Sequence, residues 1–89
     1  GFPKVDLSKY KINPNVATFI PESIVRKYKL IAIDKKEDSL VVAMADPLNF
    51  FAIDDIKLYT KMGVIPCLAT GADLERVIER YYSSILKRH

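Results

Sequence analysis

The C-terminal third of the chain carries the clearest periodic pattern of hydrophobic positions. Apolar side chains recur at three, four, seven, eight and eleven residues after Leu74, the spacing of one face of an α-helix. These positions are Leu74, Val77, Ile78, Tyr81, Tyr82 and Ile85. Thr70 and Asp73 have the spacing of a capping box in which Asp replaces the usual Glu, so we expect the helix to begin there.

Two apolar runs on either side of a charged segment predict a β-hairpin. Residues 30–33 and 40–45 are apolar at every position, and the polar residues 34–39 between them predict a loop of four to six residues. Neither run alternates between apolar and polar side chains. We therefore expect a helix to cover at least one face of the hairpin.

One helix is predicted before this hairpin in the sequence and another after it. The first covers residues 21–28, because proline is favoured at the first position of a helix. The second runs to about residue 62, with Asp46 or Asn49 as its N-cap and Gly63 as a left-handed C-cap. The buried face of this second helix is expected to hold Ala52, Ile53, Ile56, Tyr59 and Thr60.

A third strand is predicted at residues 64–69. Pro66 lacks an N–H group, which places this strand at an edge of the sheet. The connection from the second strand through the helix should be right-handed and parallel. The expected fold is α/β (α+β), a small three-stranded mixed sheet packed with helices in the order α-β-β-α-β-α. The pattern does not decide whether the third strand joins the second or the first.

The first twenty residues differ from the rest of the chain. They are irregular and interrupted by prolines, with one helical turn expected after Asn13 and Pro14. Several of their apolar side chains should be partly exposed, which is typical of a missing neighbour. These are Phe2, Val5, Tyr10 and Phe19. We therefore expect an irregular segment, 1–20, at the junction to a missing upstream subdomain, and a small α/β module, 21–86.

Composition narrows the function further. The 89 residues are enough for one domain, and the net charge of +3 arises from 14 basic and 11 acidic residues that are interleaved. Such mixing is typical of a solvated surface and argues against nucleic-acid binding. No apolar run approaches the ~20 residues of a spanning helix, so no direct membrane insertion is expected. The single cysteine, Cys67, fits a reduced compartment.

The residue types that catalysis requires are missing or badly spaced. No pair of glycines is spaced for a phosphate-binding loop, and one Cys with one His cannot form a zinc site. Asp54 and Asp55 point about 100° apart on a helix and do not converge as an acid–base pair. A nucleophilic pair of Cys67 with His89 is disfavoured relative to Cys67 as a core residue. The chain is therefore expected to have no enzymatic activity and no cofactor.

Three residues are candidates for partner binding. Interfaces concentrate their binding energy in a few Arg and Tyr side chains, which selects Arg26, with its neighbour Lys27, and Tyr82. Each has a second interpretation. Arg26 and Lys27 also fit a solvated helix end, and Tyr82 also fits the core side of the last helix. The hairpin loop from Lys35 to Asp38 and the exposed face of the last helix are further candidate surfaces.

Several segments together resemble a known bacterial family. They are residues 2–7 (FPKVDL), 20–28 (IPESIVRKY), 40–49 (LVVAMADPLN), 52–56 (AIDDI) and 78–82 (IERYY). The sequence resembles the N-terminal domain of type II secretion ATPases, which also occurs in type IV pilus assembly ATPases, and within it the C-terminal subdomain. The likeness covers nearly the whole chain, and it rests on the order and spacing of the segments.

The resemblance implies a non-catalytic docking or regulatory role in a parent ATPase. In this family the domain precedes the ATPase region and binds the cytoplasmic domain of an inner-membrane platform protein. The parent's own ATPase domain is a second expected partner, and the location is cytoplasmic, peripheral to the inner membrane. The alternative is a domain responsive to cyclic di-GMP. The ligand motifs of that alternative begin with an Arg-Leu-Gly stretch upstream of the residues present, so no cyclic di-GMP binding is expected of this chain alone.

Overall fold

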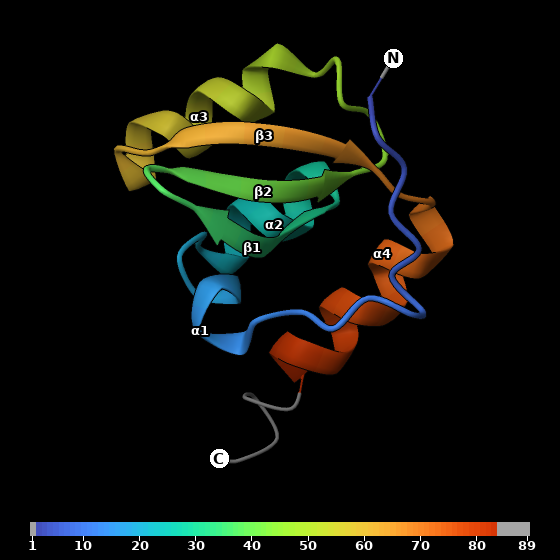
Figure 1. Cartoon of the computed structure of the whole chain (residues 1–89). Coiled ribbons are helices and arrows are strands. Elements are labelled where there is room, and N and C mark those ends of the chain that lie inside the picture. Colours follow the sequence, from blue (N-terminus) through green and yellow to red (C-terminus); the bar gives the residue numbers. More distant parts are fainter. Residues whose placement is uncertain (1, 84–89) are drawn as a thin grey trace.

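The computed structural model describes residues 2–83, which form a three-stranded mixed sheet with helices packed against it (Figure 1). The strands are β1 (Leu30–Lys36), β2 (Ser39–Met44) and β3 (Gly63–Leu68), in the order β1-β2-β3. β1 and β2 are antiparallel, whereas β2 and β3 are parallel. The predicted mixed sheet is confirmed, and the third strand joins the second, at an edge.

The hairpin between β1 and β2 is tighter than predicted. The turn contains only Glu37 and Asp38, because Lys36 already pairs with Ser39. The prediction of a loop over residues 34–39 was therefore wrong. The polar residues at the end of β1 keep their side chains largely exposed while their backbones join the ladder, and Glu37 adopts a positive φ of 54° that turns the chain.

An irregularity interrupts the pairing of β1 with β2. Ala32 pairs with Val42 and Asp34 with Val41, so Ile33 is an extra residue on β1, a β-bulge. The carbonyl of Ile33 accepts a hydrogen bond of 3.3 Å from the backbone N–H of Asn13. The bulge thus ties the sheet to the segment that precedes it.

Two helices, α2 (Glu22–Tyr28) and α3 (Phe50–Thr60), lie behind the sheet as seen in Figure 1. Both helices contact the sheet and each other. They cover the face to which alternate residues of β2 point. The side chains buried between these layers include Val25, Leu40, Val42, Met44, Ala52, Ile53 and Ile56. Tyr59 was predicted among them but is 63% exposed, because it lies on the flank of the buried stripe one residue before α3 ends.

The helix caps follow the sequence signals in part. Asn49 caps α3 by accepting a hydrogen bond of 3.3 Å from the N–H of Ala52. The left-handed C-cap is Lys61, with φ of 60°, and not Gly63, which has an ordinary φ and lies in β3. Pro21, predicted as the first helical position, is instead the N-cap of α2, and the helix begins one residue later at Glu22.

The other face of the sheet is crossed by the N-terminal segment, here called the strap (residues 2–10). The strap pairs with the end of β3, where the N–H of Val5 bonds the carbonyl of Leu68 at 2.9 Å and the N–H of Leu68 bonds the carbonyl of Pro3 at 2.8 Å. The chain then forms α1 (Pro14–Ala17) beside β1. Segment 1–20 contributes several buried side chains to the common core, namely Leu7, Ile12, Val16, Ala17 and Ile20.

The last described elements are α4 (Gly71–Ile78) and a π-helical turn, η1 (Glu79–Ser83). Thr70 caps α4 as predicted, accepting a hydrogen bond of 3.2 Å from the N–H of Asp73. The predicted apolar stripe is confirmed for the side chains that the structure describes, with Leu74, Val77, Ile78 and Tyr82 buried and Tyr81 partly buried. Ile85 and the end of the predicted module at residue 86 lie outside the described residues.

Candidate docking surfaces

Arg26, the first predicted partner-binding residue, lies exposed on α2 between two carboxylates. Its Nε atom lies 2.6 Å from Glu22, one turn earlier on α2, and its Nη1 atom lies 2.7 Å from Glu79 of η1. Hydrogen bonds to Glu79 and then Glu22 raise the pKa of the guanidinium. The side chain is therefore held in a fixed position at the surface, with its charge neutralised locally.

Lys27 lies beside Arg26 and is also exposed. Its ammonium nitrogen lies 5.1 Å from the centre of the Tyr28 ring, within the range of a cation–π contact. The Tyr28 hydroxyl in turn donates a hydrogen bond of 2.7 Å to a carboxylate oxygen of Asp55 in α3. The outer sides of α2 and α3 are thereby joined into one surface.

Tyr82, the third candidate, is a core residue of the last helix and not a surface anchor, because its side chain is only 7% exposed. The hydroxyl donates hydrogen bonds to the backbone carbonyls of Ala17, at 2.8 Å, and Ile20, at 3.3 Å. Burial raises the pKa of this phenol. The three predicted residues therefore do not converge: two lie on the surface of α2, and the third packs in the core.

A surface that the sequence analysis missed is the apolar face of α3. It consists of large hydrophobic side chains of α3, together with Leu48 just before it, that are 61–81% exposed, namely Leu48, Phe50, Phe51, Leu58 and Tyr59. The exposed Asp54 lies among them. Taken at about 200 Å² for each large side chain, these apolar side chains expose on the order of 600 Å², the upper end for a monomer. The available signal was that Phe51 and Leu58, seven residues apart, both lie outside the buried stripe.

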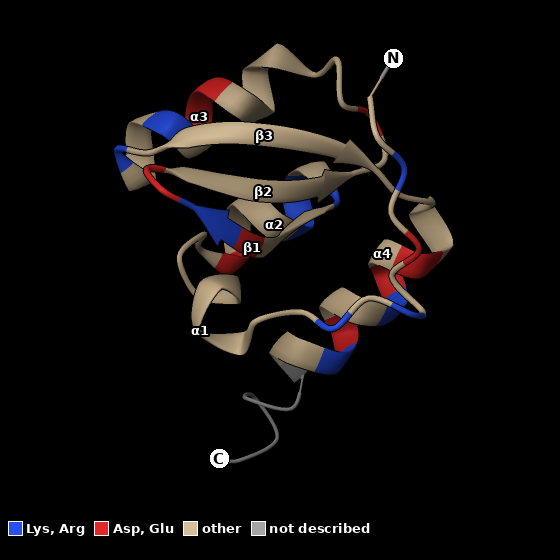
Figure 2. Ribbon diagram, in the orientation of Figure 1, with Lys and Arg blue, Asp and Glu red and all other residues tan. Residues whose placement is uncertain are grey.

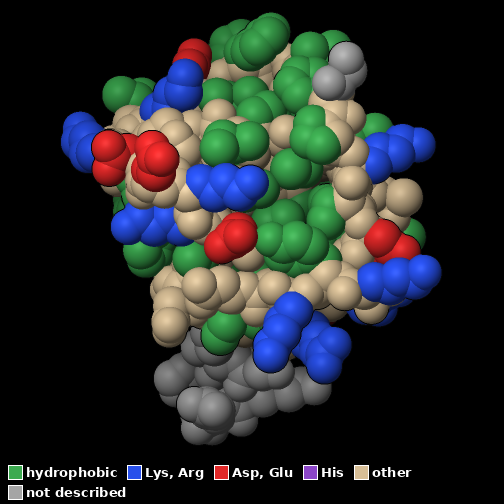
Figure 3. Space-filling view, viewed as in Figure 1, with side chains coloured by type: hydrophobic (Ala, Val, Ile, Leu, Met, Phe, Trp, Pro, Cys, Tyr) green, Lys and Arg blue, Asp and Glu red, His purple; other side chains and the backbone are tan. Residues whose placement is uncertain are grey.

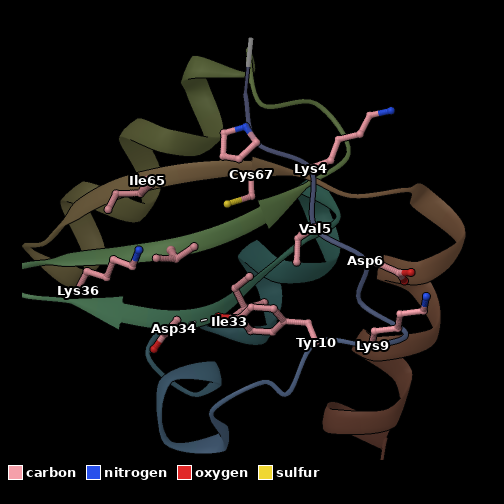
Figure 4. A pocket seen from close by; sticks show the side chains of 12 residues that line it. Lys4, Val5, Asp6, Lys9, Tyr10, Ile33, Asp34, Lys36, Ile65 and Cys67 are labelled. Atoms are coloured by element: carbon pink, nitrogen blue, oxygen red, sulfur yellow. Dashed lines mark hydrogen bonds between the residues drawn. The ribbon is translucent and has the colours of Figure 1, made fainter.

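A second apolar surface lies on the opposite side of the sheet. A hollow of about 510 Å³, open to solvent on one side, lies between the strap and the sheet and is here called the strap hollow. Figure 4 shows Val5 and Tyr10 on the strap side and Ile65 and Cys67 on β3. Figure 3 shows apolar side chains gathered on this face between charged ones of both signs.

The strap hollow has hydrogen-bonded groups at its margin. The Tyr10 hydroxyl donates to a carboxylate oxygen of Asp34 at 3.4 Å, and burial together with that carboxylate raises the pKa of the phenol. Asp6 accepts hydrogen bonds from the hydroxyl and the N–H of Ser8, which lower the pKa of its carboxyl. Burial raises the pKa of the Cys67 thiol, an effect that the charge of Lys36 partly offsets.

Other kinds of site find no support in residues 2–83. No three His, Cys, Asp or Glu side chains in this part of the chain gather closely enough to hold a metal ion. Over the same residues, no helix has the length and apolarity needed to cross a bilayer. Figure 2 shows acidic and basic positions interspersed on the hairpin and α4.

Comparison with known proteins gives the family. The MshEN domain family matches residues 1–87, almost the whole chain, so the chain belongs to that family. Among curated proteins it is similar to the type IV pilus assembly ATPase PilB of Myxococcus xanthus, with 31% identity over 93% of this chain. PilB of Thermus thermophilus is 33% identical over 92% of the chain. The chain spans only 15% and 10% of the lengths of these two relatives.

Solved structures agree with this assignment. A structure of MshE with cdg matches with a TM-score of 0.83 and 27% identity, covering 91% of this chain and 59% of that one. The N-terminal domain of XpsE matches in fold, with a TM-score of 0.80 and 22% identity over 92% of this chain and 58% of that chain. The resemblance to the N-terminal domain of secretion and pilus ATPases is confirmed.

Proposed function

We propose that this chain is a non-catalytic docking and regulatory domain of a type IV pilus assembly or type II secretion ATPase. The partner is the cytoplasmic domain of an inner-membrane platform protein, so the domain works in the cytoplasm, peripheral to the membrane. The observation that carries the proposal is the apolar face of α3, where Phe51 is 81% and Leu58 69% exposed. An apolar patch of this size on a small domain is typical of a protein–protein contact.

The neighbouring surface of α2 supplies the polar border of this contact. α2 and α3 lie side by side and are joined by the bond from Tyr28 to Asp55. Lys27, whose ammonium lies over the Tyr28 ring, gives the apolar face of α3 a polar border, an arrangement that is common in interfaces. Arg26 lies on the other side of α2, where it pairs with Glu79 of η1, and forms the outer end of this surface. The parent's own ATPase domain is a second partner on this proposal. Tyr82 contributes indirectly, by fixing the end of the last helix.

The test is a titration of this domain against purified cytoplasmic domains of the platform proteins from the same source. We expect saturable binding with a micromolar or tighter Kd, about −8 kcal/mol. Phe51→Ser should raise the Kd about tenfold or more, as for a central apolar anchor. Ile65→Ser is the matched control, because Ile65 is an exposed apolar side chain on the opposite face of the sheet.

Two outcomes would contradict the proposal. If none of the platform domains binds, the docking role is wrong for this chain. If binding occurs but Phe51→Ser and Leu58→Ser leave the Kd unchanged, the docking surface is not the apolar face of α3. Circular dichroism of each variant separates a lost contact from a lost fold.

Regulation by cyclic di-GMP is a second candidate function. It is favoured by the likeness to MshE, whose structure was solved with cdg, at 27% identity. This chain covers 59% of that MshE chain, and we place the ligand motifs in an upstream part. Calorimetry should show no cyclic di-GMP binding to this chain and binding to a form extended upstream in the parent. Binding to the chain alone would show that the ligand residues lie within it.

A further inference from the structure

We propose that the strap hollow is a second binding site, which takes an acidic peptide segment carrying a bulky aliphatic side chain. It is independent of the docking surface on α2 and α3, because the sheet separates the two. The hollow measures about 510 Å³, within the ordinary range of ligand sites. Its inner surface is mostly apolar.

The side of the hollow formed by the sheet is apolar and fits the aliphatic side chain of the ligand. Val41, Ile65 and Cys67 lie on adjacent strands and face the strap, where Val5 and the Tyr10 ring form the opposite wall (Figure 4). Val41 and Cys67 are nearly buried, whereas Ile65 remains 38% exposed at the open side. An entering leucine or isoleucine side chain would cover Ile65 and remove apolar surface from water.

The charges at the margin account for the acidic part. Lys36 lies on the sheet side of the hollow and Lys4 and Lys9 on the strap side, and none of the three forms a salt bridge within residues 2–83. The two acidic residues of the margin, Asp6 and Asp34, already accept hydrogen bonds from Ser8 and Tyr10. Bonds from neutral hydroxyls do not cancel the charge of a carboxylate, so the margin holds three cations against two carboxylates, a net charge of +1. This excess complements an acidic group next to an apolar side chain.

The shape of the hollow selects a peptide over other anions. A free phosphate has no apolar part to cover Val41 and Ile65. A membrane surface is flat and does not enter a recess walled by the strap. An extended peptide supplies both chemistries at once, because its side chains alternate in direction and follow one another at short intervals.

The test uses the ¹⁵N-labelled chain and a synthetic peptide, acetyl-Glu-Asp-Leu-Leu-Asp-Glu-amide, followed by NMR. We expect saturable shifts of the amide signals of Ile33, Val41, Ile65 and Cys67. One control peptide carries Gln and Asn in place of the acids, and another carries Ala in place of the leucines. Each control should bind at least about tenfold more weakly, since it lacks one of the two complementary features.

Variants assign the binding to the hollow. Ile65→Ser and the double variant Lys9→Glu/Lys36→Glu should each raise the peptide Kd about tenfold. Phe51→Ser and Lys57→Glu, on α3, should leave it unchanged. The reverse pattern is expected for the Kd of the platform domain, which Phe51→Ser in this chain should raise and Ile65→Ser should leave unchanged. Failure of one proposal is therefore distinguishable from failure of the other.

The inference is overturned if the peptide causes no shifts at the hollow up to millimolar concentration. It is also overturned if both control peptides bind as well as the acidic one, or if the hollow variants, once shown to be folded, bind with an unchanged Kd. Shifts confined to α2 and α3 would place an acidic peptide on the docking surface instead.

Discussion

The hydroxyl of Tyr82 donates a hydrogen bond of 2.8 Å to the backbone carbonyl of Ala17, which lies 65 residues earlier in the chain. The same hydroxyl also reaches the carbonyl of Ile20 at 3.3 Å. Both carbonyls belong to the segment around α1, so one side chain near the end of the last helix ties the first part of the chain to the core. Residues 1–20 form little regular secondary structure, so this bond is one of the contacts that hold them against the core.

Tyr82→Phe is expected to lower the free energy of unfolding by about 1 kcal/mol, because it leaves two backbone carbonyls without their donor while keeping the ring. Urea unfolding monitored by circular dichroism measures the change. Tyr81→Phe is the matched control and should have little effect, since the Tyr81 hydroxyl makes no hydrogen bond within the described residues. Equal effects of the two substitutions would show that the bond from Tyr82 does not stabilise the fold.

Arg26→Ala is expected to weaken binding of the platform domain while the domain stays folded. The side chain makes two ion pairs, with Glu22 and Glu79, but it is exposed, and exposed ion pairs contribute little to stability. Titration calorimetry measures the affinity, and a thermal melt checks the fold. An unchanged Kd would remove Arg26 from the interface, and a collapsed melting transition would give the ion pairs a structural role instead.

Local sequence patterns predicted the sheet but not the hairpin turn. The strands and their mixed pairing follow from the apolar runs and from Pro66, whose missing N–H falls on the same outer edge that Leu68 presents to the strap. The turn was predicted too long because Asp34, Lys35 and Lys36 have the composition of a loop. They form a strand because they pair with β2, whose strand propensity is strong.

The candidate sites were predictable only in part, for a related reason. Arg26 and Lys27 were placed correctly at the surface by the helical pattern. The apolar face of α3 was missed because α3 carries apolar side chains on its exposed side as well as its buried side, so its periodicity predicts only the buried stripe. The strap hollow needs residues 3–10 to lie over side chains from all three strands, a long-range arrangement that no local pattern encodes.

Lys61→Gly is expected to stabilise the domain by about 0.5–1 kcal/mol. Lys61 holds the left-handed C-cap of α3 at φ of 60°, a conformation that glycine adopts without the clash of a side chain. Lys57→Gly is the control, since the same change inside the helix should cost about 1 kcal/mol. Both values come from urea unfolding. Destabilisation by Lys61→Gly would mean that the Lys61 side chain makes a compensating contact.

The thiol of Cys67 is expected to react slowly and with a shifted pH profile. Burial raises its pKa, so at a given pH the folded chain holds less thiolate than the unfolded chain, and alkylation by iodoacetamide proceeds mainly through the thiolate. The apparent pKa from the rate profile should therefore lie above that of the chain unfolded in guanidinium. The stability that the thiol contributes should be fully present below the pKa of the unfolded chain. It should be lost as the pH rises through the raised pKa of the folded chain.

Lys36→Ala sharpens this prediction. The charge of Lys36 lowers the pKa of the thiol, against the effect of burial, so its removal should move the rate profile of Cys67 to still higher pH. Lys57→Ala, on the opposite side of the sheet, should leave the profile in place. A profile that does not respond to Lys36→Ala would show that the Lys36 ammonium is not close to the hollow in solution. The acidic-peptide site would then lose one of its three cations, and the Lys9→Glu/Lys36→Glu variant would have to act through Lys9 alone.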